Sequence, residues 1–134
     1  CQHYYIETMR LFICAAILLL AGCDRGVVGD STVFGDYNLR TVNGKSLPAT
    51  AGNIQYLDDV ISLAEAGTYI ETGHTKNTDT GATQTIMETG SYQFFFSTNL
   101  QLTRSDGLRQ RLFAVENSDK MTYVEDGVTL VFRK

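Results

Sequence analysis

Side chains that could carry acid–base chemistry are few in this sequence. Of its two histidines, only His74 lies beyond the first few residues. His74 falls in the polar, threonine-rich stretch 72–85, which we expect to form a hairpin tip. A general base needs a positioned partner, and the sequence pattern offers none. We therefore predict no catalytic residue, and an enzyme is the least favoured of the functions considered.

Adjacent acids at Asp58 and Asp59 are the best candidates for binding a hard cation. Neighbouring side chains on a strand point to opposite faces, however, and calcium takes six or more oxygen ligands. A solvated turn is the simpler interpretation. Zinc sites need several cysteines or histidines, and beyond residue 22 the sequence offers only Cys23 and His74. We predict no metal and no cofactor.

Three arginines, Arg104, Arg109 and Arg111, cluster within one expected hairpin. They could meet an anionic headgroup or a peptide carboxylate, or they could form a solvated face that protects a sheet edge. The formal net charge of the whole chain is −4. Because nucleic-acid-binding proteins usually present a basic patch, this balance argues against a nucleic-acid partner.

The N-terminal region has the order of a bacterial signal peptide. Arg10 follows Met9 and precedes the apolar run 11–20, which ends in small residues and Cys23. A transmembrane helix is the alternative, but a bilayer core needs about 20 apolar residues and this run is about half as long.

Residues 20–23, Leu-Ala-Gly-Cys, resemble the lipobox of bacterial lipoproteins. The resemblance implies that Cys23 receives a diacylglycerol and that the signal is cut before it. Two or three acyl chains hold a protein firmly on a membrane. We therefore expect an exported protein of the bacterial cell envelope, attached through its N-terminal lipid to the periplasmic face or the cell surface. The expected segments are an over-extended reading frame or a fragment edge (1–8), the signal peptide (9–22), a lipidated tether (23–33) and a β domain (34–134).

From residue 34 onward the pattern is one of strands and turns. Thr, Tyr, Phe and Val are frequent, Gly and Asn separate the strand-like stretches, and Pro48 is the only proline. No window shows a helical apolar repeat. Strands are predicted near 35–42, 53–57, 60–64, 68–75, 84–88, 91–97, 100–104, 108–115, 120–124 and 128–133. The predicted fold class is all-β, a small antiparallel up-and-down barrel or strongly curled meander of about eight to ten strands.

Hairpin turns predict the register of the later strands. A three-residue loop at 105–107 sets Leu100 opposite Leu112, whereas a two-residue loop sets Arg104 against Arg109. We favour the longer loop because like charges directly opposite repel. Arg109 and Arg111 then point outward.

Two further hairpins follow from the same reasoning. A loop at 97–99 sets Phe96 opposite Leu100. A two-residue turn at Asp126-Gly127 pairs Tyr123 with Leu130 and Met121 with Phe132. The residues expected to face the core or a ligand include Tyr37, Tyr69, Tyr92, Phe94, Phe96, Leu112, Tyr123 and Phe132. Phe95 and Phe113 are expected on the outside, where they and the three arginines could form a partner surface.

Residues 35–48, GDYNLRTVNGKSLP, resemble the start of small bacterial lipocalin-like lipoproteins, which read G-x-Y-x-L-x-x-V-N-G-x-x-L-P. The likeness continues through 61–63, 67–69, 88–92 and 129–134. It implies that the β domain (34–134) is lipocalin-like, a compact antiparallel barrel of about eight strands. True lipocalins place an arginine of the last strand over a Gly-x-Trp tryptophan, and Gly35, Tyr37 and Arg133 could take those parts here.

An eight-stranded barrel has room either for side chains alone or for one small ligand. The first hypothesis is therefore a membrane-anchored lipoprotein whose barrel binds a small apolar ligand, a lipid or a peptide in the cell envelope. The alternative is a structural or protein-interaction module that has a filled barrel and acts through its outer surface, with an envelope protein as partner.

Overall fold

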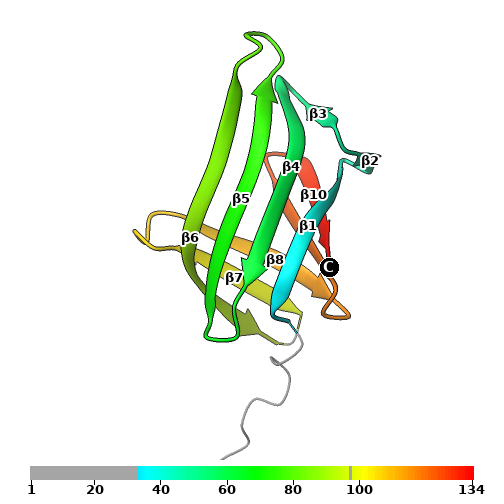
Figure 1. Cartoon of the computed structure of the whole chain (residues 1–134). Helices are drawn as coiled ribbons and strands as arrows, with labels where there is room; N and C mark the ends of the chain where they lie inside the picture. Colours follow the sequence, from blue (N-terminus) through cyan, green and yellow to red (C-terminus); the bar gives the residue numbers. More distant parts are fainter. Residues whose placement is uncertain (1–32, 97) are drawn as a thin grey trace, which may run out of the picture.

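Ten antiparallel strands run through residues 33–96 and 98–134, which a computed structural model describes (Figure 1). The strands are β1 (Gly35–Val42), β2 (Lys45–Ser46), β3 (Ala49–Ala51), β4 (Ile54–Leu63), β5 (Thr68–Asn77), β6 (Thr83–Phe95), β7 (Asn99–Arg104), β8 (Gln110–Glu116), β9 (Lys120–Glu125) and β10 (Val128–Arg133). The described ranges contain no helix long and apolar enough to cross a membrane.

The sheet closes on itself through β1. This strand pairs with β10 on one side and with β4 on the other, so that β1 and β4 to β10 form an eight-stranded barrel. β2 and β3 are short additions beside β1 and β4. Strands that follow one another around this barrel are also consecutive among its eight strands, which confirms the predicted all-β, lipocalin-like up-and-down barrel. Closure also removes the exposed edges that an open sheet would carry.

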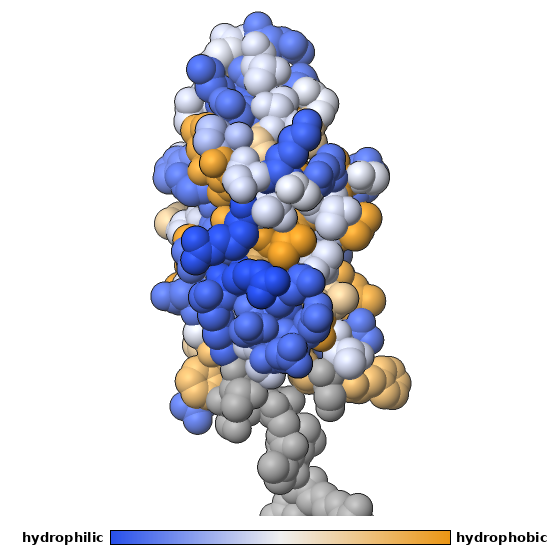
Figure 2. Space-filling model, turned by 90° about the vertical axis from the view of Figure 1, so that its right-hand side faces the viewer, coloured by the Kyte–Doolittle hydropathy of each residue, from blue (hydrophilic) through white to orange (hydrophobic). Residues whose placement is uncertain are grey.

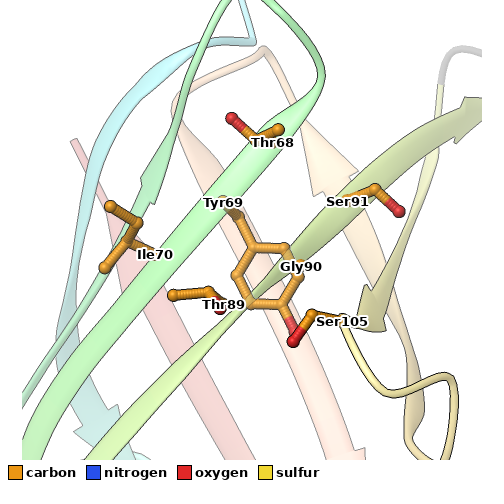
Figure 3. Close-up of a pocket in the computed structure, with 7 residues that line it drawn as sticks. All are labelled: Thr68, Tyr69, Ile70, Thr89, Gly90, Ser91 and Ser105. Carbon is orange, nitrogen blue, oxygen red and sulfur yellow. The ribbon is translucent and has the colours of Figure 1, made fainter.

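Strands 84–88 and 91–97, predicted as separate, form the single strand β6. Gly90 does not interrupt strand β6. The ring of Tyr69, its partner on β5, lies against the glycine (Figure 3). A Cβ at Gly90 would lie 2.7 Å from Cε1 of Tyr69 and 2.0 Å from the carbonyl oxygen of Thr103. Glycine is required here for close approach within the strand.

The predicted strands 53–57 and 60–64 likewise form one strand, β4, with a bulge between Tyr56 and Asp58. The stretch 72–85 is mostly strand, and its turn is confined to residues 78–82. At the end of the barrel that carries this turn, β4, β5 and β6 extend beyond the β7–β8 hairpin (Figure 1).

The predicted register of β7 and β8 is wrong by one residue. Leu100 pairs with Phe113, and the N–H of Arg104 donates to the carbonyl of Arg109 at 2.9 Å. This is the register rejected for its like charges. It is tolerated because each arginine has its own carboxylates: Arg104 bonds to Asp106, and Arg109 bonds to Glu88 and Glu125.

That one-residue difference exchanges the two faces of β8. Phe113 is fully buried and Arg111 is 4% exposed, whereas Leu112 is 58% exposed. The outward placement predicted for Phe113 and Arg111 is therefore wrong, as is the inward placement of Leu112. Inside the barrel, Phe113 stacks on Tyr123 with ring centroids 4.9 Å apart and meets Phe132 edge-on at 6.1 Å.

The other two hairpins keep their predicted faces. Tyr92 pairs with Leu102 and Phe94 with Leu100, two residues away from the predicted register, so both aromatic residues still face inward and are partly buried. Phe96 is the exception: it lies in the turn with φ +54° and is 90% exposed. The turn at Asp126-Gly127 is confirmed, since Tyr123 pairs with Leu130 and Met121 with Phe132.

Substitutions at adjacent residues of β8 test this register. We expect Phe113→Ala to lower the free energy of unfolding by about 3–5 kcal/mol, because it leaves a cavity in the aromatic core. Leu112→Ala removes a mostly exposed side chain and is expected to change stability by less than about 0.5 kcal/mol. Urea denaturation of both variants measures the difference. A greater loss from Leu112→Ala would show that the predicted register was correct.

Candidate functional site

Two glutamates face each other inside the barrel. Glu71 on β5 pairs directly with Glu88 on β6, and their residues are only 2% and 7% exposed. Like charges in this position repel. Arg111 on β8 lies against both: its Nη1 donates to Glu71 Oε1 at 3.0 Å, and its Nη2 donates to Glu71 Oε2 and, at 3.0 Å, to Glu88 Oε1. This single guanidinium joins β5, β6 and β8.

Glu88 receives two further hydrogen bonds. The Tyr69 hydroxyl donates to Oε1 at 2.6 Å, and Nη1 of Arg109 donates to Oε2 at 3.1 Å. Burial alone would raise the pKa of Glu88, but the Tyr69 hydrogen bond and the charges of Arg111 and Arg109 lower it below its usual value. Glu88 is therefore an ionised acceptor. Burial and the hydrogen bond to Glu88 raise the pKa of Tyr69, which stays a neutral donor.

Aromatic rings flank the guanidinium of Arg111. Its central carbon lies 5.5 Å from the Phe113 ring centroid and 5.8 Å from that of Tyr123, within cation–π range. Burial opposes the charge of Arg111, but Glu71 outweighs that effect and raises its pKa. Its Nε atom is buried and has no hydrogen-bond partner among the described residues.

Asp59 on β4 is a third buried acid beside this network. A bulge after Tyr56 allows both Tyr56 and Asp59 to face inward. Gly73, the partner of Asp59 on β5, provides the space: a Cβ there would lie 3.0 Å from the Asp59 side-chain carbon Cγ. Burial, followed by the nearby charge of Glu71 and a side-chain hydrogen bond with Glu71, raises the pKa of Asp59 to about 8. Asp59 therefore holds a proton at neutral pH.

Asp59, Glu71, Arg109 and Arg111 line a cavity of about 250 Å³ at the end of the barrel where β4, β5 and β6 extend. Its walls combine charged, aromatic and aliphatic groups. The lining residues are Ile54, Tyr56, Asp59, Glu71, Thr75, Gln84, Ile86, Arg109, Arg111, Tyr123, Glu125 and Leu130. A site with apolar walls and a few converging polar groups is typical of small-molecule binding.

A second hollow lies on the barrel surface beside Gly90 and is open to solvent (Figure 3). Its lining consists mainly of small polar side chains, Thr68, Thr89, Ser91 and Ser105, together with Ile70 and the ring of Tyr69. None of these side chains is charged, and the hollow offers no converging set of functional groups.

Of the residues predicted for a site, the structure brings Tyr69, Tyr123, Arg109 and Arg111 together around the network. Tyr37 and Phe132 lie elsewhere in the core, and the Tyr37 hydroxyl donates to the carbonyls of Val33 and Ser118. The remaining predicted residues are separate: Tyr92, Phe94 and Phe95 are partly buried, Arg104 pairs with Asp106 near the surface, and Phe96 and Leu112 are exposed.

Sequence reasoning missed Glu71 and Glu88 and placed Asp59 in a solvated turn, which is wrong. Glu71 carried a usable signal, because it shares the alternating inward phase of Tyr69 on the same strand. Glu88 carried a weaker signal. Because a break between two strands was expected near Gly90, the alternation that places Glu88 on the inner face of β6 could not be followed through the glycine. The bulge that turns Asp59 inward leaves no local mark in the sequence.

His74 does have a partner, contrary to expectation. Its Nδ1 lies 2.8 Å from Asp58 Oδ1, and both side chains are about half exposed on the outside of the barrel. Asp58 and Asp59 point to opposite faces, as predicted. Within the described residues, no group of three or more His, Cys, Asp or Glu side chains could hold a metal ion.

The fold and the cavity define an eight-stranded lipocalin-like barrel with a charged interior at one end. No protein-family model, curated protein or solved structure matches this chain.

Replacing Arg111 tests its importance to the fold. We expect Arg111→Met to lower the free energy of unfolding by about 3–5 kcal/mol, because Glu71 and Glu88 would remain buried with fewer partners. Arg104→Met, which removes a surface arginine paired with Asp106, is expected to change stability much less, because surface ion pairs contribute little. Thermal and urea unfolding measure both effects.

A rescue variant separates loss of charge pairing from loss of packing. Adding Glu71→Gln and Glu88→Gln to Arg111→Met removes the opposed charges and should restore part of the lost stability. If the triple variant is less stable than Arg111→Met alone, the charge argument is wrong.

Proposed function

We propose that this chain is an exported bacterial lipoprotein, held on an envelope membrane by lipid on Cys23, whose lipocalin-like barrel binds one small ligand. The cavity at the end of the barrel carries the binding part of this proposal. The lipobox-like residues 20–23 carry the anchoring part, and they lie outside the described residues.

The size and lining of the cavity favour a compact amphiphile over a long lipid chain. Its volume of about 250 Å³ is slightly below the ~300 Å³ at which pockets for drug-sized ligands begin. A ligand with a long chain would need the barrel centre, where Phe113, Phe132 and Leu100 already pack. Ile54, Ile86 and Leu130 suit a short hydrocarbon group, and the charged floor suits a polar one.

The position of the cavity agrees with a tethered receptor. The proposed tether, residues 23–33, would join the barrel at the start of β1, where Gly35 pairs with Leu63 at the end of β4. Ile54 and Tyr56 of the cavity lie at the opposite end of β4 (Figure 1). In this arrangement the ligand enters from the side away from the membrane.

The outer-surface alternative loses two of the five residues that suggested it. Phe113 and Arg111 are buried inside the barrel, so they cannot join Phe95 and Arg109 in one exposed patch. Hydrophilic residues predominate on the face shown in Figure 2, and its hydrophobic residues form separate areas. No continuous apolar surface on that face suggests a protein partner.

Cysteine variants test the anchor. In bacterial cells fed radiolabelled palmitate, we expect the unaltered chain to be labelled and to sediment with membranes. Cys23→Ala should abolish the labelling, because the lipobox then has no thiol to receive the lipid. Cys14→Ala lies in the expected signal core and should leave the labelling intact. Equal labelling of the unaltered chain and Cys23→Ala would contradict the anchor.

NMR titration tests the cavity. We expect at least one of 1-butanol, sodium butyrate and n-butylamine, added at millimolar concentration, to shift the backbone amide signals of Thr75, Gln84 and Glu125. Signals of Asn43 and Ser118, which do not line the cavity, serve as controls and should stay in place. If no probe shifts the cavity signals selectively, the proposed binding function is wrong.

A further inference from the structure

We infer that the ligand is a small organic cation, such as a primary amine, whose charged group lies against the carboxyl group of Asp59 in the end cavity. This inference rests on the proposed function, because it names the chemistry of the ligand bound at the same site.

Asp59 is the first reason. Its residue is 4% exposed and lines the cavity, and its Oδ1 atom has no hydrogen-bond partner in the described structure. Buried polar atoms in folded proteins are nearly always hydrogen-bonded, so an exception calls for an explanation. A ligand that donates hydrogen bonds into this cavity would provide one.

The charge balance of the lining is the second reason. The carboxyl groups of Asp59, Glu71 and Glu125 outnumber the guanidinium groups of Arg109 and Arg111. Both arginines also bond to Glu88 behind the lining, which leaves less of their charge for a ligand. Even while Asp59 holds its proton, the carboxylates of Glu71, Glu125 and Glu88 outnumber the two guanidinium groups, so an anionic ligand would meet excess negative charge, whereas a cation would compensate it.

The walls suit the remainder of such a ligand. Tyr56 lies on the same strand as Asp59, separated from it by the bulge, and both line the cavity. An aromatic ring near a carboxylate is a common arrangement for an alkylammonium group, which gains from both charge and cation–π contact. Ile54, Ile86 and Leu130 can cover a short alkyl chain.

Proton exchange follows from this geometry. The groups facing Asp59 are Glu71 from β5 and Arg111 from β8, with Asp58 beside it on β4. Because burial and Glu71 raise the pKa of Asp59 to about 8, the free protein holds a proton there at neutral pH. When an alkylammonium ion binds, the ion takes the place of this proton, which is released to solvent. Affinity should therefore rise with pH and level off near pH 8.

Isothermal titration calorimetry of the purified protein with n-butylamine hydrochloride tests the inference. Between pH 6 and pH 7.5 we expect the association constant to rise by up to about tenfold per pH unit, the limit for release of one proton. Titrations at pH 7 in two buffers of different ionisation enthalpy should show close to one proton released. This measurement uses the unaltered chain and needs no variant.

Two matched variants locate the effect. Asp59→Asn keeps the shape of the protonated side chain and should weaken butylamine binding at pH 7.5 at least about tenfold, with little remaining pH dependence. Asp36→Asn changes an exposed acid on β1 that does not line the cavity and does not contribute to the pKa of Asp59, and it should leave both properties unaltered. Unchanged binding by Asp59→Asn would overturn the inference.

The neutral and anionic probes separate this inference from the proposed function. If 1-butanol or butyrate binds in the cavity at least as tightly as butylamine, the ligand is not selected as a cation, and only this inference fails. If none of the three binds, the proposed function fails with it. Tighter binding of butylamine, accompanied by proton release, supports both.

Discussion

The barrel is organised around one buried guanidinium. Arg111 enters the interior from β8 and bonds to Glu71 and Glu88, two carboxylates that face each other across β5 and β6. Buried charges are tolerated only when they are paired and hydrogen-bonded. Since a one-residue slip of β8 would turn Arg111 outward and leave the opposed carboxylates without it, the network fixes which face of β8 is inside. The same slip would expose Phe113.

Arg111 also divides the interior into two regions. On one side of it, Phe113 and Phe132 pack with the aliphatic side chains of the core. On the other side lies the cavity, at the end of the barrel where β4, β5 and β6 extend beyond the β7–β8 hairpin (Figure 1). The ion network therefore lies between the apolar core and the cavity and contacts both. Core packing and ligand access consequently depend on the same side chains.

Features set by local chemistry could be predicted from the sequence, whereas features set by distant partners could not. The bounds of β1 and β10 and the Asp126-Gly127 turn follow from alternation and turn preferences. The β7–β8 register was missed because repulsion between Arg104 and Arg109 was weighed without Glu88, 21 residues away from Arg109 in the sequence. Asp59 was missed because only the three-dimensional bulge turns it inward. The lipid anchor stays a prediction from residues 20–23.

Stability alone is a poor explanation for this interior. A buried ion network is often no more stable than a well-packed hydrophobic set of similar volume, and replacing such a network can stabilise a protein by about 1–4 kcal/mol. Here the network is accompanied by Asp59, whose Oδ1 has no hydrogen-bond partner within residues 33–96 and 98–134 and whose burial favours unfolding as the pH rises toward 8. A barrel selected only for stability would replace Asp59 with an apolar residue. Its position in the cavity wall instead agrees with a carboxyl group kept available for a ligand, at a cost to the stability of the free protein.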